Sequence, residues 1–408
     1  MHRALRLLPR PLRQSVLAQS LRHVRYSTSA TPTRLQYLSL YNYTEIDEHE
    51  LPRLRKRMVE RWSELRVLGR IYIAQEGINA QLLLPAVNVD AFADSFPDLF
   101  ARDRLNFGAV YEIPGDASVD ESGIQLFDKL DIRIRKQIVA DGFEKAPLNL
   151  QDSGNALPPD QWHHKLQQRN TTHDDRTLVL DVRNFYEHEV GRFDGATRIM
   201  VDTFRDTFDA VDEILENHAA AHDGAPPREV MMYCTGGIRC EKVGAYLKQH
   251  KGIDAIHKLA GGIVQYQRFL KDHPEEASLF KGRNFVFDQR CVSADGLAED
   301  VTSDVLGECF QCGEPCNDHT NCSNLMCHGL ILQCTGCATA YSGACSAACR
   351  DEVLKMAAMS TEEQRQYRKE NAHLWKPQVA NAPPAAQIKF VKFRPVPPTL
   401  KQQRVSSV

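Results

Sequence analysis

The sequence predicts an α/β protein made of several domains. Three observations predict it: a length of 408 residues, strand-like and helix-like segments that alternate in the N-terminal third, and a cysteine placed between an apolar run and a helix-like segment. One hydrophobic core rarely serves a chain of this length, so two or three domains are expected. With 42% apolar and 25% charged residues the composition is that of a soluble globular protein, and no apolar run is long enough to span a bilayer. A net charge of -3 gives no chain-wide signal for nucleic acid, so RNA would have to contact local basic patches.

Residues 34–150 are predicted to form a ferredoxin-like (acylphosphatase-like) domain with the order βαββαβ. The periodicity indicates strands at 35–41, 69–74, 75–84 and 130–139, and helices at 48–68 and 89–99. The last of these strands carries Arg133, Arg135 and Lys136, which are candidates for RNA binding. A solvated strand face is the default interpretation of such charges.

The central region contains a loop with the character of a nucleophile site. The loop consists of Cys234, Thr235, Gly236, Gly237, Ile238, Arg239 and Cys240, between the apolar run 229–233 and a helix-like segment. Backbone N–H groups and the positive end of a helix dipole favour a thiolate at such a junction, the two glycines permit a tight turn, and Arg239 adds a fixed positive charge. We therefore predict that Cys234 and Arg239 are catalytic. The alternative is a buried structural cysteine in an ordinary turn.

This loop resembles the active-site loop of rhodanese domains, in which the cysteine carries a persulfide sulfur. Protein tyrosine phosphatases have one more residue between cysteine and arginine, so the shorter loop favours sulfur over phosphate. Segments 178–183 and 184–196 resemble the strand and helix of the same domain, with Asp181, Arg183 and Glu187 as supporting residues, and 256–263 resembles its closing strand and Gly-Gly turn. The resemblance implies a rhodanese α/β domain with a parallel sheet over residues 172–285.

The combination of segments is similar to the bacterial rhodanese-type tRNA uridine hydroxylases over residues 35–350. It consists of a small α/β domain with the string Glu-Gly-Ile-Asn at 76–79, the string CTGGIRCEK at 234–242 and a cysteine-rich tail. The resemblance implies an oxygen-dependent conversion of the wobble uridine to 5-hydroxyuridine, with tRNA as the partner. Ala80 stands where this family usually has glycine.

Two other functions stay open. The first is a thiosulfate or persulfide sulfurtransferase, which would pass sulfane sulfur through a Cys234 persulfide and take a sulfur donor protein as its partner. The second is a non-catalytic interaction module, which is least favoured because the loop keeps both its cysteine and its arginine. The sequence has no flavin or nicotinamide signature, so no nucleotide cofactor is expected.

Residues 300–356 form a cysteine-rich segment that is predicted to bind metal. Nine of the 12 cysteines fall here: Cys309, Cys312, Cys316, Cys322, Cys327, Cys334, Cys337, Cys345 and Cys349. In a reducing compartment these spacings favour metal over disulfides, and eight thiolates would close about two tetrahedral zinc sites. His319 and His328 are substitute ligands. An iron–sulfur cluster and a region without metal are the alternatives.

Both ends of the chain have a basic composition. Residues 1–33 are rich in arginine and contain no acidic residue, which is typical of a transit peptide and predicts the mitochondrial matrix, with the plastid as the alternative. A basic RNA-binding arm is the other interpretation of this end. Residues 357–408 are predicted to be a basic flexible tail that either contacts tRNA phosphates or is simply solvated.

Overall fold

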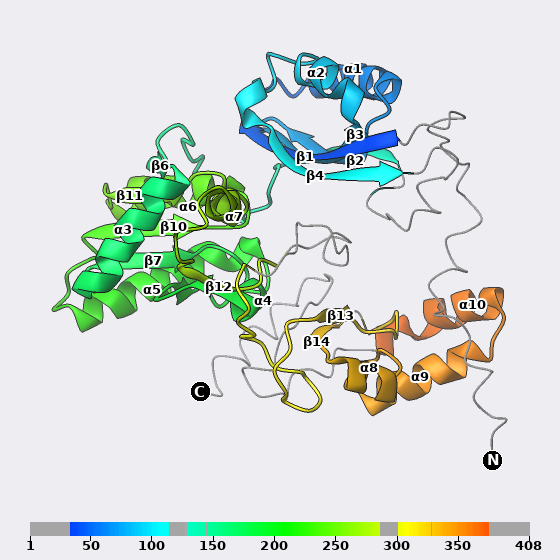
Figure 1. Ribbon diagram of the computed structural model, residues 1–408. Coiled ribbons are helices and arrows are strands. Elements are labelled where there is room, and N and C mark those ends of the chain that lie inside the picture. Colours follow the sequence, from blue (N-terminus) through cyan, green and yellow to red (C-terminus); the bar gives the residue numbers. More distant parts are fainter. Residues whose placement is uncertain are drawn as a thin grey trace.

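The structure is a computed structural model that describes residues 33–113, 127, 129–143, 146–285, 301–327 and 329–374 (Figure 1). The expected transit peptide lies outside the described residues except for its last residue, and so does the tail beyond residue 374. Among the helices that the structure describes, none is long and apolar enough to cross a membrane.

In the described part of the chain, the N-terminal unit is a five-stranded sheet with two helices on one face (Figure 1). Its strands are β1 (Thr33–Tyr43), β2 (Leu68–Ala74), β3 (Gly77–Pro85), β4 (Asn106–Ile113) and β5 (Leu130–Ile134), in the spatial order β4-β1-β3-β2-β5. Helices α1 (Leu51–Glu64) and α2 (Val89–Ala93) complete the expected βαββαβ order. In α1, Leu51, Met58 and Trp62 recur at helical spacing and are buried, which explains why this segment forms a helix against the sheet.

The prediction that residues 130–139 supply the last strand of the βαββαβ order is wrong. That strand is β4, which pairs antiparallel with β1, whereas β5 is a fifth strand that runs parallel to β2 at the opposite edge. β5 ends at Ile134 because its partner β2 ends at Ala74, and the last contact is the Arg135 N–H bonded to the Ile73 carbonyl at 2.9 Å. Ile138 returns to the same alternation after Lys136, so periodicity alone could not place the end.

The second unit is a parallel sheet in the order β6-β11-β10-β7-β9. Its strands are β6 (Asn155–Leu157), β7 (Thr177–Asp181), β9 (Thr197–Arg198), β10 (Glu229–Tyr233) and β11 (Ile256–Leu259). Its helices are α3 (Pro159–Thr172), α4 (Phe185–Val190), α5 (Thr207–Ala221), α6 (Ile238–Lys251) and α7 (Gly262–Asp272), and β8 (Gly191–Phe193) pairs antiparallel with β12 (Phe280–Gly282). Leu180 faces a core formed with α5 and α6, and Val179 faces a core formed with α3 and α7, so β7 is buried on both sides.

This unit begins earlier than the predicted residue 172. β6 pairs with β11, and α3 places Trp162 in the same core as Val179. The sequence pattern could not predict this boundary, because β6 is only three residues long and reads Asn-Ala-Leu, without an apolar run.

The N-terminal and second units meet at Lys242 of α6. Its ammonium donates to the Glu76 carboxylate at 2.8 Å, to the Asp141 carboxylate at 2.7 Å and to the Val139 carbonyl at 3.1 Å. The Lys242 side chain is 1% exposed, so the charge is matched almost without water. This network fixes the turn between β2 and β3 against the helix that follows the cysteine loop.

The C-terminal unit holds nine of the 12 cysteines. It contains the antiparallel pair β13 (His319–Asn321) and β14 (Leu330–Leu332) and the helices α8 (Thr335–Ala340), α9 (Ala347–Ala357) and α10 (Thr361–Asn371). The prediction of a flexible tail from residue 357 is therefore wrong for 361–371. The Ser360 hydroxyl accepts the Glu363 N–H at 3.3 Å, and the Glu363 carboxylate accepts the Ser360 N–H at 2.7 Å, which is a capping box that starts α10.

We expect Lys242→Met to lower the free energy of unfolding by about 3 kcal/mol or more, because the Asp141 carboxylate would stay buried without its partner. Differential scanning calorimetry measures this as a lower unfolding temperature. Lys251→Met is the matched control on the same helix, since Lys251 and Asp212 form a partly exposed pair, a class worth under about 1 kcal/mol. Equal unfolding temperatures for the two variants would contradict the account of Lys242.

Candidate active site

The Cys234 thiol lies at the carboxyl end of β10, in the turn that leads into α6. The Gly237 N–H donates to its sulfur at 3.1 Å, and the positive end of the α6 dipole lies beside it. Gly237 has a φ of +99°, in the left-handed region that favours glycine, and a Cβ there would lie 2.6 Å from the Tyr41 hydroxyl. On the other side of the loop, a Cβ at Gly262 would lie 2.4 Å from the Cys234 carbonyl. The tight turn with backbone N–H groups around Cys234, which the sequence predicts, is therefore present. Tyr41 and Gly262 pack against this turn, which is called the backbone cradle below.

The surroundings lower the pKa of the Cys234 thiol to about 6. Burial is the largest influence and opposes ionisation, but it is outweighed by the hydrogen bond from the Cys240 thiol, the positive charge of Arg239 and the backbone N–H groups of Arg239 and Gly236. Burial and the neighbouring Cys234 sulfur raise the pKa of Cys240 well above its ordinary value. At neutral pH the pair therefore keeps a proton on Cys240 and a thiolate, the nucleophilic form, on Cys234.

Arg239 is held in place by Glu187 of α4. The guanidinium donates to both carboxylate oxygens, at 2.7 and 2.9 Å. The same carboxylate accepts the Thr235 hydroxyl at 3.1 Å and the Asn184 N–H at 3.0 Å. Glu187 thus connects α4 to the cysteine loop, fixes the side chain of Arg239 and balances its charge. The supporting role predicted for Glu187 corresponds to a direct contact with the loop.

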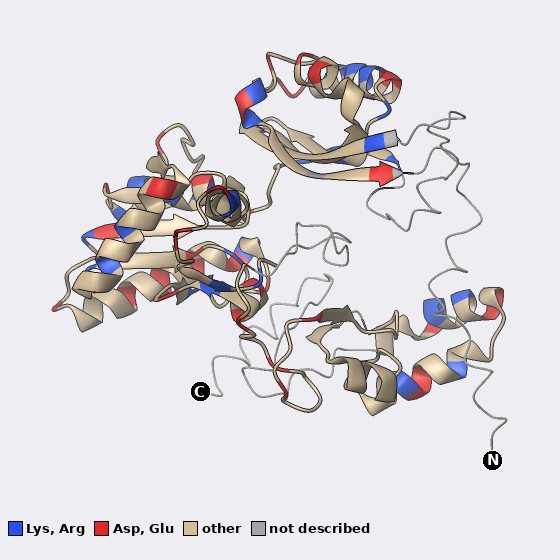
Figure 2. Cartoon of the chain, viewed as in Figure 1, with Lys and Arg blue, Asp and Glu red and all other residues tan. Residues whose placement is uncertain are grey.

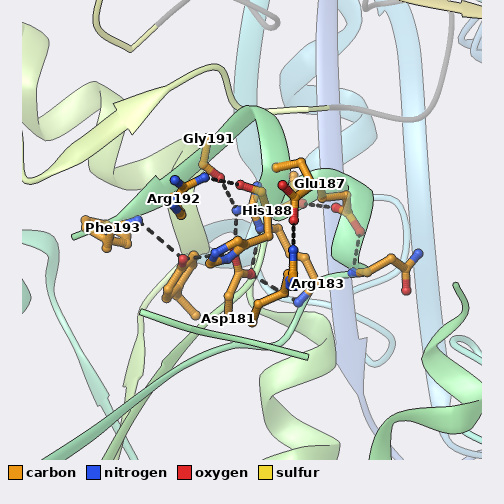
Figure 3. Close-up of polar contacts among 12 residues, drawn as sticks. Asp181, Arg183, Glu187, His188, Gly191, Arg192 and Phe193 are labelled. Carbon is orange, nitrogen blue, oxygen red and sulfur yellow. Dashed lines mark hydrogen bonds and ion pairs between the residues drawn. The ribbon is translucent and has the colours of Figure 1, made fainter. Parts of the chain in front are cut away.

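Asp181 and Arg183 belong to a separate buried cluster (Figure 3). The Asp181 carboxylate accepts from Arg183 at 2.8 and 2.6 Å and from the Tyr233 hydroxyl at 2.9 Å, and it lies 2.9 Å from His188 Nδ1. Arg183 also donates to the Gly191 carbonyl at 2.6 Å. Burial alone would raise the pKa of Asp181, but the Arg183 charge and these hydrogen bonds hold it well below its usual range. Among the contacts that the structure describes, these two residues join β7 to β8 and β10, and their support of the loop is indirect.

The N-terminal unit closes over the loop with two tyrosines that sequence reasoning missed. The Tyr41 hydroxyl lies against Gly237, and the Tyr43 hydroxyl donates to the Ile238 carbonyl at 3.1 Å. Burial, with the charges of Glu241 and Cys234 added, raises the pKa of Tyr41 well above its ordinary value, so the hydroxyl keeps its proton. A strand pattern gives no sign of a contact 195 residues away. By contrast, Glu76 and Lys242 stand inside the strings at 76–79 and 234–242 that the sequence singled out.

Eight of the nine candidate metal ligands gather into two groups of four cysteines. Within each group all sulfurs lie within 4.8 Å of one another; the groups are Cys309, Cys312, Cys334, Cys337 and Cys322, Cys327, Cys345, Cys349. The Cys312–Cys334 sulfurs are 3.7 Å apart, and the Cys327–Cys345 sulfurs are 3.6 Å apart. Thiolates ~2.3 Å from a tetrahedral zinc lie ~3.8 Å from one another. The donor sets therefore fit a tetrahedral metal ion, and the two groups interleave along the chain.

Cys316 is the one predicted ligand that falls outside both groups. Its sulfur accepts the Asp318 N–H at 3.4 Å, so its assignment as a ligand is wrong for the arrangement that the structure describes. His319 packs against Phe285, with ring centroids 4.0 Å apart and the rings tilted by 47°, and joins neither group. His328 lies outside the described residues.

The three RNA-binding candidates lie on or just after β5. Arg133 bonds to Asp131 at 3.0 Å, Arg135 places its guanidinium 5.3 Å from the centre of the Tyr72 ring, and Lys136 is exposed. On α10, Lys and Arg are mixed with Glu (Figure 2), so the basic character expected of the tail does not extend to this helix.

Comparison with known proteins gives the family. A model described as UPF0176 acylphosphatase like domain matches residues 35–138, one described as Rhodanese-like domain matches 161–269, and one described as Rhodanase C-terminal matches 281–350. The tRNA uridine(34) hydroxylase of Enterobacter sp. (strain 638) is 36% identical over 335 residues, which are 81% of this chain and 85% of the relative. That of Leptospira interrogans serogroup Icterohaemorrhagiae serovar Lai (strain 56601) is 37% identical over 332 residues, 81% of each chain. The chain belongs to the tRNA uridine(34) hydroxylase family.

These matches confirm the prediction, made from the sequence, that the chain is a tRNA uridine(34) hydroxylase with acylphosphatase-like and rhodanese-like domains. The three matched segments follow the three units of the structure, and both cysteine groups fall within the third. The chain is therefore an enzyme of this rhodanese-containing family, with the Cys234 loop in its rhodanese-like domain.

We expect Cys234→Ser to lower the hydroxylation rate by more than about 1000-fold, because the nucleophile is lost while a side chain of similar size keeps the fold.

In the wild type, a depressed thiol pKa of about 6 means that the thiolate fraction rises with pH through that value, so kcat/KM for tRNA should rise between about pH 5 and pH 7 and then level off. Cys240→Ala, which removes a hydrogen bond to the sulfur, should move this rise to higher pH. A fully active, well-folded Cys234→Ser protein would contradict the assignment.

Proposed function

We propose that this protein converts the wobble uridine of tRNA to 5-hydroxyuridine in an oxygen-dependent reaction, with Cys234 as the nucleophile. The observation that carries the proposal is the Cys234 thiol itself, which is buried, has a pKa of about 6 and lies in a loop whose Gly237 packs against Tyr41 of the N-terminal unit. Relatives that share the whole arrangement at 36–37% identity are named for hydroxylation of uridine 34.

The charge balance of the loop supports a neutral substrate. The positive charge of Arg239 is matched by Glu187 through two hydrogen bonds, at 2.7 and 2.9 Å. A dianion such as thiosulfate is best held by cations that are not already paired with a carboxylate. A pyrimidine ring carries no net charge and needs no such cation. The pairing therefore favours a nucleobase at Cys234.

A sulfurtransferase is the second candidate, and one observation favours it. The thiolate and its backbone cradle suit a persulfide, the sulfur carrier of rhodanese domains, as well as they suit attack on a base. In that case a sulfur donor protein would be the partner instead of tRNA.

Nucleoside analysis of tRNA separates the two functions. Cells without this protein should lack 5-hydroxyuridine and its derivatives at the wobble position, and wild-type protein should restore them while Cys234→Ser does not. Mass spectrometry of digested tRNA measures the result. If the nucleoside is unchanged in these cells while persulfide transfer is lost, the sulfurtransferase replaces the hydroxylase.

We also propose that each four-cysteine group holds one zinc ion. Sulfur separations of 3.6–3.7 Å support tetrahedral ligation by four thiolates. Four protein ligands leave no open position, so the metal would serve folding rather than chemistry. The free energy of binding would then stabilise residues 309–349, because the interleaved ligands connect both halves of this segment.

Elemental analysis tests the zinc proposal. The protein purified without chelator should contain about two zinc ions, and the double change Cys334→Ser with Cys337→Ser should remove one of them. Cys316→Ser is the matched control, because its sulfur lies outside both groups and both ions should stay. A preparation without metal would contradict the proposal, and a brown, iron-containing one would point to an iron–sulfur cluster instead.

We propose the mitochondrial matrix as the location. The support is the composition of residues 1–33, rich in arginine and without an acidic residue. A fluorescent fusion of the full chain should follow a mitochondrial marker, and removal of residues 1–33 should release it. A plastid pattern would support the alternative organelle.

A further inference from the structure

The sheet of the N-terminal unit has a second face, opposite α1 and α2, which reaches the cysteine loop. Tyr41 on this face lies against Gly237. In the strand register, Tyr41 is opposite Asn79, Asn79 is opposite Tyr72, and Tyr72 is opposite Arg133. Opposed residues share a face and neighbouring strands are ~4.8 Å apart, so this row runs ~14 Å from the loop to the edge strand β5.

A second row follows on the same face, one step away from the loop. Gln81 on β3 is opposite Arg70 on β2, and Arg70 is opposite Asp131 on β5. Arg70 and Arg133 are exposed and Tyr72 is half-buried. Aromatic, amide and basic side chains therefore occupy this face at β2 and β5.

The opposite face of β2 and β3 is apolar and packs against α1 and α2. Ile71 and Ile73 of β2, with Ile78 and Leu82 of β3, are fully buried in the core under the helices. The alternation of β2 thus places apolar residues toward α1 and α2, and Arg70 and Tyr72 away from them. Arg70 and Tyr72 are therefore not part of that core, whereas Leu68 and Leu83, farther along the same face, are buried.

Arg135 adds a stacked cation to this face. Its guanidinium carbon lies 5.3 Å from the centre of the Tyr72 ring, which is the geometry of a cation–π contact. Asn79 donates to the Ile138 carbonyl at 3.2 Å, so the connection to the second unit crosses the row between Tyr41 and Tyr72. The half-buried Tyr72 and the cations around it lie on the β5 side of this crossing.

We propose that Arg70, Tyr72 and Arg135, here named the sheet track, bind the single-stranded nucleotides next to the uridine that reaches Cys234. The proposal rests on the proposed function, because it takes tRNA as the substrate, and adds where the anticodon loop is held. Unpaired bases stack on tyrosine rings and guanidinium planes, and arginines neutralise phosphates. A duplex exposes no base faces to such a surface, so the occupant is a single strand.

The affinity of the full-length protein for an unmodified anticodon stem-loop tests the track. Fluorescence anisotropy should show that Tyr72→Ala raises the Kd about 5- to 150-fold, the effect of losing one stacked base, and that Tyr72→Phe stays close to wild type. Arg70→Gln and Arg135→Gln should each lower the slope of log Kd against log salt by about 0.7. The paired stem alone should bind wild type and Tyr72→Ala alike.

Arg57→Gln is the matched control. Arg57 on α1 lies 5.7 Å from the centre of the Phe96 ring, so it is an arginine stacked on an aromatic ring on the opposite side of the same sheet. Its Kd should equal that of the wild type. A loss of affinity in Arg57→Gln equal to that in Arg135→Gln would overturn the track and indicate the helix side instead.

A crosslink makes the test independent of how the variants fold. A 4-thiouridine placed beside the target uridine should crosslink on irradiation to the peptide that contains Arg70 and Tyr72, identified by mass spectrometry. If the wild type binds and hydroxylates the stem-loop but this peptide is not labelled and Tyr72→Ala has an unchanged Kd, the track is wrong and the proposed function stands. If the wild type neither binds nor hydroxylates tRNA, the proposed function fails and the track fails with it.

Discussion

The arrangement of the active site depends on one buried ammonium group. Lys242 donates to Glu76 of the N-terminal unit and to Asp141 and Val139 of the connecting segment, and each of its three N–H donors has an acceptor. A buried charge costs several kcal/mol unless it is matched in this way. Displacement of the N-terminal sheet would break the match, so Tyr41 is held against the cysteine loop.

Two carboxylate–guanidinium pairs in the rhodanese-like domain have different roles, one in the fold and one at the cysteine loop. The Asp181–Arg183 pair is fully buried and joins strands of the fold. The Glu187–Arg239 pair lies at the loop, where it orients the arginine and leaves little net charge. The thiolate at Cys234 is then stabilised by nearby hydrogen-bond donors and by Arg239. Chemistry and RNA recognition are thus assigned to different units that share one boundary.

The features that the sequence predicted are local ones. The Cys234 turn follows from a strand, a turn with glycines and a helix within a short stretch, and β1, α1, β2 and β3 follow from periodicity. What the sequence could not show depends on pairing over distance. Four-cysteine groups that interleave cannot be sorted from spacing alone, so the spacing also predicts Cys316 as a ligand, although it lies outside both groups. β5 follows strand periodicity whichever neighbour it pairs with, and the contact of Tyr41 with Gly237 needs two domains in place.

The central claim is that the N-terminal sheet and the cysteine loop form one site, held together by the hydrogen bonds of Lys242. The most direct test is the rate at which iodoacetamide alkylates Cys234, followed by mass spectrometry of its peptide in wild type, Lys242→Met and Lys251→Met. Because Cys234 is 0% exposed, the account predicts slow alkylation in the wild type and in Lys251→Met despite the low thiol pKa. In folded Lys242→Met the rate should rise as the sheet moves away from the loop. An unchanged rate in that variant would contradict the account.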